Sequence, residues 1–173
     1  APWLDSVFRD RATVLGFLNG LTRRRCIKSH SPMDGILYAK EPLYIVVYRH
    51  PIDVHFSMRS HSENMKDDVF RNMFPKDEQA GFQRFVTAPT TVSGTDDLSL
   101  ASIVHHYEQS RLFAEGGNVH FFHYADLSHD LRGQITRLSG LLNVSLSPGL
   151  LDEIAEANTF SSMRKTAEES PFR

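Results

Sequence analysis

The sequence lacks the features expected of an exported, zinc-binding or membrane-spanning protein. Cys26 is the only cysteine, so neither an intrachain disulfide nor a cysteine-based zinc site is possible, and this usage is typical of a reducing compartment. The longest apolar runs cover only a few residues, far fewer than the roughly 20 that span a bilayer. The chain also does not open with a basic segment followed by an apolar stretch. We therefore expect a soluble, cytoplasmic protein that does not bind membranes.

The charge balance argues against a large basic surface. Lysine and arginine number 19 against 21 aspartate and glutamate residues, which gives a net charge of -2 at pH 7. Binding along a nucleic-acid backbone usually needs a basic excess spread over one face. We therefore expect no nucleic-acid partner, and any anion site must be local. With 173 residues, 40% of them hydrophobic, the chain suits a single globular domain over residues 1–173.

Two apolar runs predict the strands of a sheet. Residues 43–48 are rich in β-branched and aromatic side chains, which is typical of a parallel strand buried on both faces, and residues 119–124 predict a second strand. Helical spacing, with end signals at Pro51, Gly116, Gly117 and Pro148, predicts helices over residues 7–21, from 51, 78–86, 98–115, 131–142 and from 148. Strands that alternate with helices predict an α/β fold, with a parallel sheet flanked by helices and joined by right-handed crossovers.

The stretch between residues 64 and 97 is polar and carries Pro75, Pro89 and Gly94, so we interpret it as an excursion or lid. The aromatic residues within 70–85 leave two interpretations open. They line a hydrophobic pocket for an acceptor molecule, or they belong to the core.

The turn after the first predicted strand is a candidate anion site. Ligands of open parallel sheets bind beyond the carboxyl ends of the strands, where a following helix offers free N–H groups. Arg49 lies at the exit of this strand and can present a bidentate guanidinium to a phosphate, while Ser57 can add a hydroxyl. The alternative is that Asp53 pairs with Arg49 and that Ser57 simply faces solvent.

Four segments, in order along the chain, resemble the cytosolic-type sulfotransferases. Residues 48–57, YRHPIDVHFS, are similar to the family's 3′-phosphate-binding segment, and residues 28–32, KSHSP, are similar to its K-(T/S)-H-x-P loop. Residues 121–126 resemble its strand ending in Y-x-D, and residues 160–163 resemble its F-x-x-M element. The resemblance implies a sulfotransferase fold related to that of P-loop NTPases, and transfer of a sulfuryl group without a metal.

The resemblance also implies a donor and the residues that bind it. The donor is 3′-phosphoadenosine 5′-phosphosulfate, and the product is adenosine 3′,5′-bisphosphate. Arg49 and Ser57 would hold the 3′-phosphate. The residues implied to lie near the adenine are Tyr124, Phe160 and Met163.

The same resemblance implies catalytic roles for the loop at residues 28–32. His30 would be the general base that takes a proton from the acceptor's hydroxyl or amine, and Lys28 would face the sulfuryl group. Histidine titrates near neutrality, and a lysine two residues away projects to the same side of an extended backbone, where it can stabilise negative charge. On the residues alone, His30 would be interpreted as an ordinary loop histidine.

Two departures from the family pattern affect the ends of the chain. The lysine-bearing K-x-G-T-T loop that binds the 5′-phosphosulfate has no counterpart, and only Arg173 corresponds, weakly, to the family's F-x-R-K-G phosphate segment. We therefore expect a sulfotransferase-like domain that is incomplete at both ends, with an unpaired sheet edge or a covering segment from elsewhere.

The histidine pairs do not predict a metal site. His105 and His106 would point about 100° apart on a helix, and His120 and His123 would lie on opposite faces of a strand.

Two functions therefore remain open. The first is sulfuryl transfer to a small hydroxylated or amine acceptor, and the second is a non-catalytic module that binds a nucleotide or a protein partner. A P-loop kinase is excluded because its G-x-x-x-x-G-K-(S/T) loop is missing from the sequence.

Overall fold

The computed structural model describes residues 10–64, 74–90 and 99–169. These residues form two compact units. The first contains residues up to 39 and residues 55–115, and the second contains residues 40–54 and 116 onward. In the parts of the chain that are described, no helix is both long enough and apolar enough to cross a bilayer.

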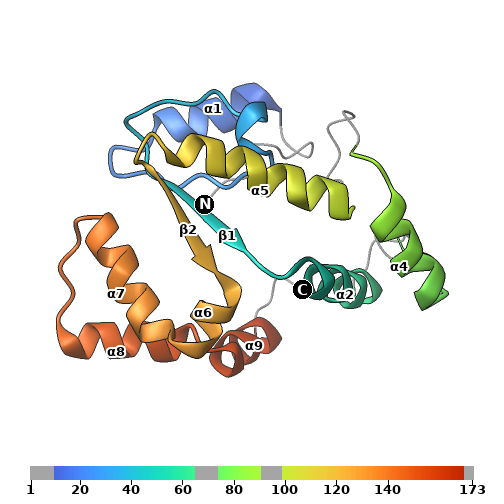
Figure 1. The fold of residues 1–173 in the computed structure, drawn as a ribbon. Helices are drawn as coiled ribbons and strands as arrows, with labels where there is room; N and C mark the ends of the chain where they lie inside the picture. Colours follow the sequence, from blue (N-terminus) through green and yellow to red (C-terminus); the bar gives the residue numbers. More distant parts are fainter. Residues whose placement is uncertain (1–9, 65–73, 91–98, 170–173) are drawn as a thin grey trace. The chain divides into compact units, whose positions relative to one another are not determined.

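The second unit contains a parallel pair of strands, β1 (Tyr44–Tyr48) and β2 (Val119–His123). Figure 1 shows the two strands side by side, and the register runs from Tyr44 opposite Val119 to Tyr48 opposite His123. The Asn118 side chain steadies the entry to both strands by donating to the carbonyls of residues 40 and 42 at 3.1 and 2.8 Å. Both predicted strands are thus confirmed, and they are parallel as expected.

The burial predicted for β1 is wrong. Its residues alternate, with Ile45 and Val47 exposed at 38% and 56% while Tyr48 is buried. A continuous apolar run indicates double burial only when layers cover both faces. Among the described residues β1 pairs with one strand, β2, and the face that carries Ile45 and Val47 stays largely open.

Four helices follow β2 in the second unit. They are α6 (Tyr124–His129), α7 (Leu131–Leu141), α8 (Pro148–Ala157) and α9 (Phe160–Glu169). The side chain of Asp130 caps α7, and that of Ser147 caps α8 one residue before Pro148, as the sequence predicts. Arg137 attaches α7 to β2 because it donates to the Phe121 carbonyl at 2.8 Å and its guanidinium covers the Phe122 ring at 4.4 Å.

The strand predicted over residues 119–124 ends one residue early. It stops at His123, and Tyr124 is the first residue of α6, so Tyr124 and Asp126 lie in the first turn of a helix. Aromatic residues are common in strands, so the sequence analysis took Tyr124 as the last residue of the apolar run although it begins α6. The sequence analysis predicted neither α6 nor α9.

The first unit is built from helices. It contains α1 (Arg11–Asn19), the 3-10 turn η1 (Met33–Gly35), α4 (Glu78–Thr87), α5 (Leu100–Ala114) and most of α2 (Pro51–Glu63). Each expected helix is present, although α1 is shorter than residues 7–21 because it ends at the Gly20 cap and residues 1–9 lie outside the described part. Past the end of α5, Gly117 has a φ of +81°, a conformation that favours glycine.

A histidine lies at the centre of the aromatic residues of the first unit. His55 is 2% exposed, and its ring meets those of Phe82 and Phe85 at centroid distances of 5.6 and 4.7 Å, with Phe56 and Phe74 also in contact. Burial lowers the pKa of His55, and the nearby Arg59 charge lowers it further. For Phe74, Phe82 and Phe85, therefore, the structure favours the core interpretation over an acceptor pocket.

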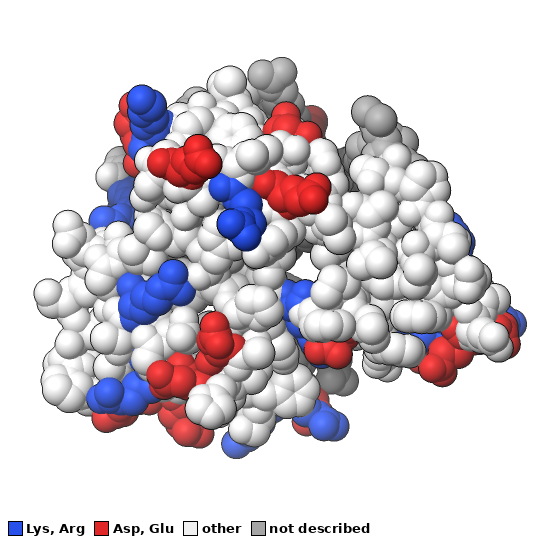
Figure 2. All heavy atoms as spheres, viewed as in Figure 1, with Lys and Arg blue, Asp and Glu red and all other residues white. Residues whose placement is uncertain are grey.

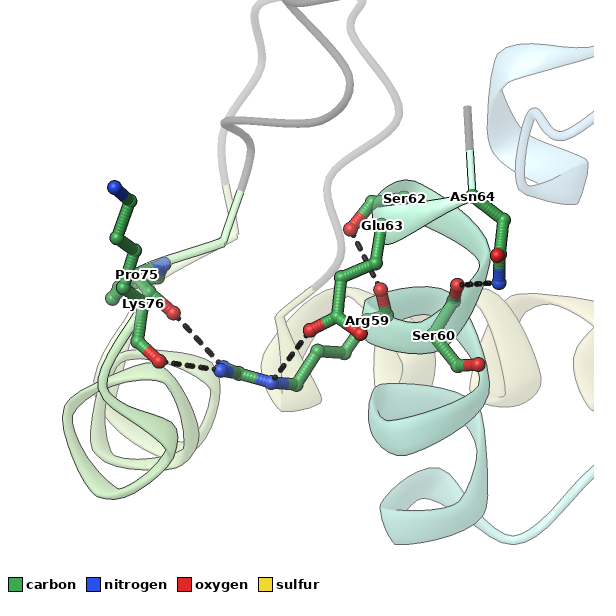
Figure 3. Close-up of polar contacts among 7 residues, drawn as sticks. All are labelled: Arg59, Ser60, Ser62, Glu63, Asn64, Pro75 and Lys76. Carbon is green, nitrogen blue, oxygen red and sulfur yellow. Dashed lines mark hydrogen bonds and ion pairs between the residues drawn. The ribbon is translucent and has the colours of Figure 1, made fainter. Parts of the chain in front are cut away.

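Arg59 joins the end of α2 to the segment before α4, as Figure 3 shows. Its two terminal nitrogens donate to the carbonyls of Pro75 and Lys76 at 2.9 and 2.7 Å, and its Nε lies 3.6 Å from the Glu63 carboxylate. The Arg59 side chain is only 14% exposed. The contact therefore links α2 to the residues that lead into α4.

Candidate functional site

Arg49 and Tyr124 meet where the two parallel strands end. Arg49 directly follows β1, and Tyr124 directly follows β2. The Arg49 guanidinium lies over the Tyr124 ring, with its carbon 4.5 Å from the ring centroid. Since paired parallel strands end at the same edge of a sheet, the topology explains how residues 75 positions apart come together. This edge can be followed in Figure 1 from the tips of β1 and β2 into α2 and α6.

The Arg49 Nε makes only a loose polar contact among the described residues. This nitrogen is 3.8 Å from the Asp53 carboxylate, which is an ion pair but is too long for a hydrogen bond. The same Nε is buried and has no hydrogen-bond partner among the described residues. The Asp53–Arg49 pair that the sequence analysis offered as an alternative therefore forms, but only as a loose ion pair. An oriented guanidinium of this kind can bind a phosphate through two parallel N–H donors.

Ser57 lies on α2, one helical turn beyond Asp53, and is exposed. It belongs to the part of α2 that is counted with the first unit, whereas Arg49 belongs to the second. The hydroxyl is thus accessible to a ligand. Its action on the same phosphate as Arg49 stays a prediction.

The residues implied for the adenine are accessible in the second unit. Tyr124 is 40% exposed, and on α9 Phe160 and Met163 are 73% and 49% exposed. The hydroxyl of Thr159 caps α9 by accepting from the Ser162 amide at 3.3 Å, which places Phe160 in its first turn. Large exposed apolar side chains of this kind can stack on a flat heterocycle. Arg173 lies outside the described residues.

The loop with the predicted base lies in the first unit. Lys28 and His30 are both exposed, and Lys28 forms an isolated β-bridge. The amide of Ser31 donates to the Ser29 hydroxyl at 3.0 Å, so the loop is ordered locally. The next turn, η1, buries Met33 to 3% exposure and anchors the loop in the unit.

Two histidines of α5 contact this loop, and sequence analysis missed their role. The His105 Nε2 lies 2.9 Å from the Asp34 carboxylate, and the backbone of Ser31 acts to raise the pKa of His106. Burial lowers the pKa of His106, and this effect outweighs the raising effect of its backbone contacts. Adjacent histidines on a predicted helix were the available signal, but we weighed them only as metal ligands. In the described residues no group of three or more His, Cys, Asp or Glu side chains could hold a metal ion.

The structure therefore brings the predicted residues together in two sets. Arg49 and Tyr124 meet in the second unit, and Lys28 and His30 share one loop in the first. On the face shown in Figure 2, basic and acidic side chains are interspersed, and neither sign covers a large continuous area. This pattern suits a local anion site on named residues.

Comparison with known proteins gives one family. Residues 1–170 match the family model described as a sulfotransferase domain. A glycolipid sulfotransferase of Mycobacterium bovis is 29% identical over 196 residues, an alignment that includes 98% of this chain and 60% of the relative. A glycolipid sulfotransferase of Mycobacterium tuberculosis is 28% identical with the same coverage of each chain. The chain thus spans about 60% of the length of these curated relatives.

Solved structures share the fold at lower identity. A mouse sulfotransferase crystallised with PAP has a TM-score of 0.71 at 18% identity, and the match covers 86% of this chain and 50% of that one. A retinol dehydratase in complex with androsterone and the inactive cofactor PAP has a TM-score of 0.61 at 18% identity, and the match covers 88% and 42%. The expected α/β fold with a parallel sheet and flanking helices is therefore confirmed.

Proposed function

Because the chain belongs to the sulfotransferase domain family, we propose that it carries the 3′-phosphate site and the catalytic base of a sulfotransferase. The reaction moves a sulfuryl group from 3′-phosphoadenosine 5′-phosphosulfate to a hydroxyl or amine acceptor. The observation that carries this proposal is the Arg49 guanidinium stacked on Tyr124 at the carboxyl ends of β1 and β2. Ligands of open parallel sheets bind at this edge, and the buried Arg49 Nε has no hydrogen-bond partner in the described chain.

The donor would be held by its phosphate and its base. Arg49 supplies a planar, permanently charged donor group for the 3′-phosphate, and Ser57 adds a hydroxyl from α2. Tyr124 supports the guanidinium from one side, which reduces the side-chain entropy lost on binding. Around the adenine, the exposed faces of Tyr124, Phe160 and Met163 offer stacking surfaces.

The chemistry would fall to the loop at residues 28–32. The bound donor supplies the sulfuryl group and leaves as adenosine 3′,5′-bisphosphate. His30 takes the proton that the acceptor loses as its oxygen or nitrogen bonds to sulfur. Lys28 stabilises the negative charge that develops on the transferred group and its leaving oxygen. Neither role needs a metal ion.

The names of the relatives support one class of acceptor. The curated proteins at 28–29% identity are named as glycolipid sulfotransferases. A sugar hydroxyl is the kind of small hydroxylated group that a base such as His30 can deprotonate. We therefore extend the proposal to a hydroxylated acceptor, with glycolipid headgroups as the first class to test.

A transfer assay with ³⁵S-labelled donor tests the proposal. Wild-type protein and the variants His30→Ala and His61→Ala are incubated with donor and with glycolipid or simple hydroxylated acceptors, and labelled product is counted. His61 is a matched control because it is also an exposed histidine, on α2. His30→Ala should abolish transfer while adenosine 3′,5′-bisphosphate still binds, and His61→Ala should behave as wild type.

Two results would contradict parts of the proposal. If wild-type protein binds the bisphosphate but sulfates no acceptor, the chain is the non-catalytic module considered above. If His30→Ala loses bisphosphate binding and transfer together, the role of His30 as the base is wrong.

A further inference from the structure

A hydrogen bond joins α5 to the turn that follows the loop with the proposed base. The Nε2 of His105 on α5 lies 2.9 Å from the Oδ2 of Asp34 on η1. An ionised carboxylate only accepts hydrogen bonds, so the imidazole is the donor and its Nε2 carries the proton. The side chains of His105 and Asp34 are 36% and 44% exposed, and exposed pairs of this kind contribute little to global stability. The contact is therefore better suited to setting the position of η1 than to stabilising the fold.

The η1 turn packs against the residue next to the base. Ser31 directly follows His30, and a methyl group added to Gly35 would lie 3.6 Å from the Ser31 Cβ, which is van der Waals contact. The Gly35 amide donates to the Pro32 carbonyl at 2.9 Å, so the turn is closed by its own backbone. The Met33 side chain within it is only 3% exposed. A shift of η1 is therefore felt at Ser31, beside the base.

The residues between His30 and Asp34 have little freedom to absorb such a shift. The Ser31 amide donates to the Ser29 hydroxyl at 3.0 Å, which fixes the backbone directly after the base. The ring of Pro32 restricts its φ, which is -63°. The position of Asp34 is thus transmitted along a short, constrained backbone to His30.

We propose that Asp34 and His105 form a positioning pair, which holds η1 on α5 and thereby keeps the His30 imidazole oriented toward the acceptor. The proposal rests on the function proposed above, because it gives His30 the role of base. A second contact with α5, between the rings of Tyr38 and Phe113 at 5.0 Å, lies beyond η1 and farther from His30 along the chain. Misplacement of a catalytic group by about 1 Å can cost about 100-fold in rate, so even a small relaxation of the loop should be measurable.

A double-mutant cycle tests whether the two residues act through their contact. Asp34→Ala and His105→Ala should each lower kcat about tenfold and change the KM for the donor by less than about twofold, because Arg49 and Tyr124 belong to the second unit. The double variant should be no slower than either single variant, since one contact is lost only once. Asp34→Asn keeps an acceptor for the Nε2 proton and should stay within about twofold of the wild-type kcat.

Glu108→Ala is the matched control. Glu108 is an exposed residue of α5, so this variant removes a carboxylate from the helix and leaves the contact with η1 in place. It should keep the wild-type kcat. An equal loss of kcat in Glu108→Ala and Asp34→Ala would overturn the inference, because the loss would then follow from charge and not from the contact. If Asp34→Ala does not fold, His105→Ala is compared with Asp34→Asn, since alanine suits a helix interior.

Amide exchange at Gly35 separates this inference from the proposed function. The Gly35 amide donates to the Pro32 carbonyl, so Asp34→Ala should speed its exchange about tenfold, and Glu108→Ala should not. A wild-type protein without any transfer activity would refute the proposed function, but the exchange rates would still decide whether Asp34 holds η1. Unchanged exchange at Gly35 in Asp34→Ala would overturn the inference. Additive losses of kcat in the double variant would also overturn it, as would an unchanged kcat in a protein that His30→Ala inactivates.

Discussion

Replacing Arg59 by methionine should destabilise the first unit by about 2–4 kcal/mol. The substitution removes two hydrogen bonds from a charged donor, to the carbonyls of Pro75 and Lys76 at 2.9 and 2.7 Å. Hydrogen bonds of charged groups contribute roughly 1.5–3 kcal/mol each, which applies to the part-buried Pro75 contact, whereas the exposed Lys76 contact adds at most about 1 kcal/mol because water competes for it. The ion pair with Glu63 adds little, because Glu63 is 63% exposed and such pairs contribute about 0.5 kcal/mol or less. Methionine keeps most of the apolar stem, so lost packing is a small part of the effect.

Urea unfolding followed by far-ultraviolet circular dichroism measures this change, with Glu63→Gln as the control. Glu63→Gln removes the ion pair and leaves both carbonyl contacts, so it should cost less than about 0.5 kcal/mol. If Arg59→Met also costs less than about 0.5 kcal/mol, or if the two variants cost the same, the hydrogen bonds of Figure 3 do not hold α2 to the segment before α4.

Three further predictions concern stability. Because burial lowers the pKa of His55, its contribution to stability is complete above the unfolded pKa of about 6.5 and is lost as the pH falls below it. His55→Leu should therefore flatten the fall in urea midpoint between about pH 7 and pH 5, with His106 left to supply the rest, and an unchanged pH profile would contradict this. Asp77→Ala removes the side chain that caps α4 by accepting from the Ala80 amide at 2.7 Å, and it should lower the free energy of unfolding in urea by about 1 kcal/mol. A decrease of only a few tenths of a kcal/mol would mean that the cap is not formed. Gly117 has a φ of +81°, so Gly117→Ala should lower the melting temperature. In α7 a methyl group on residue 140 meets nothing within 4 Å, so Gly140→Ala should maintain or raise the melting temperature. The reverse order would be inconsistent with the backbone described.

The sequence predicted the strands and most helices because their signals are local. The apolar runs at residues 43–48 and 119–124 correspond to β1 and β2, and end signals such as Ser147 before Pro148 mark the start of α8. Helices α6 and α9 were missed for the same reason. Tyr124 continues an apolar run although the chain has already turned into α6, and most of α9 is polar.

Burial and partners were harder to predict because they depend on elements distant in sequence. The exposure of Val47 depends on which layer covers β1, and the burial of His55 depends on phenylalanines contributed by α4 and by the segment before it. In the candidate site, the position of Arg49 followed from the strand-to-helix turn. Its contact with Tyr124 follows from the pairing of β1 with β2, which no local pattern reveals.

The measurement that tests the central claim most directly is calorimetric binding of adenosine 3′,5′-bisphosphate to wild-type protein, Arg49→Ala and Arg132→Ala. Arg132 is a matched control because it is also an arginine of the second unit. Its 2.6 Å contact with Asp152 joins α7 to α8. Loss of a charged hydrogen-bonding group should weaken binding by about 2 kcal/mol or more, roughly 30-fold, in Arg49→Ala and leave Arg132→Ala at the wild-type affinity. Equal affinity in all three proteins would contradict the assignment of Arg49 to the 3′-phosphate.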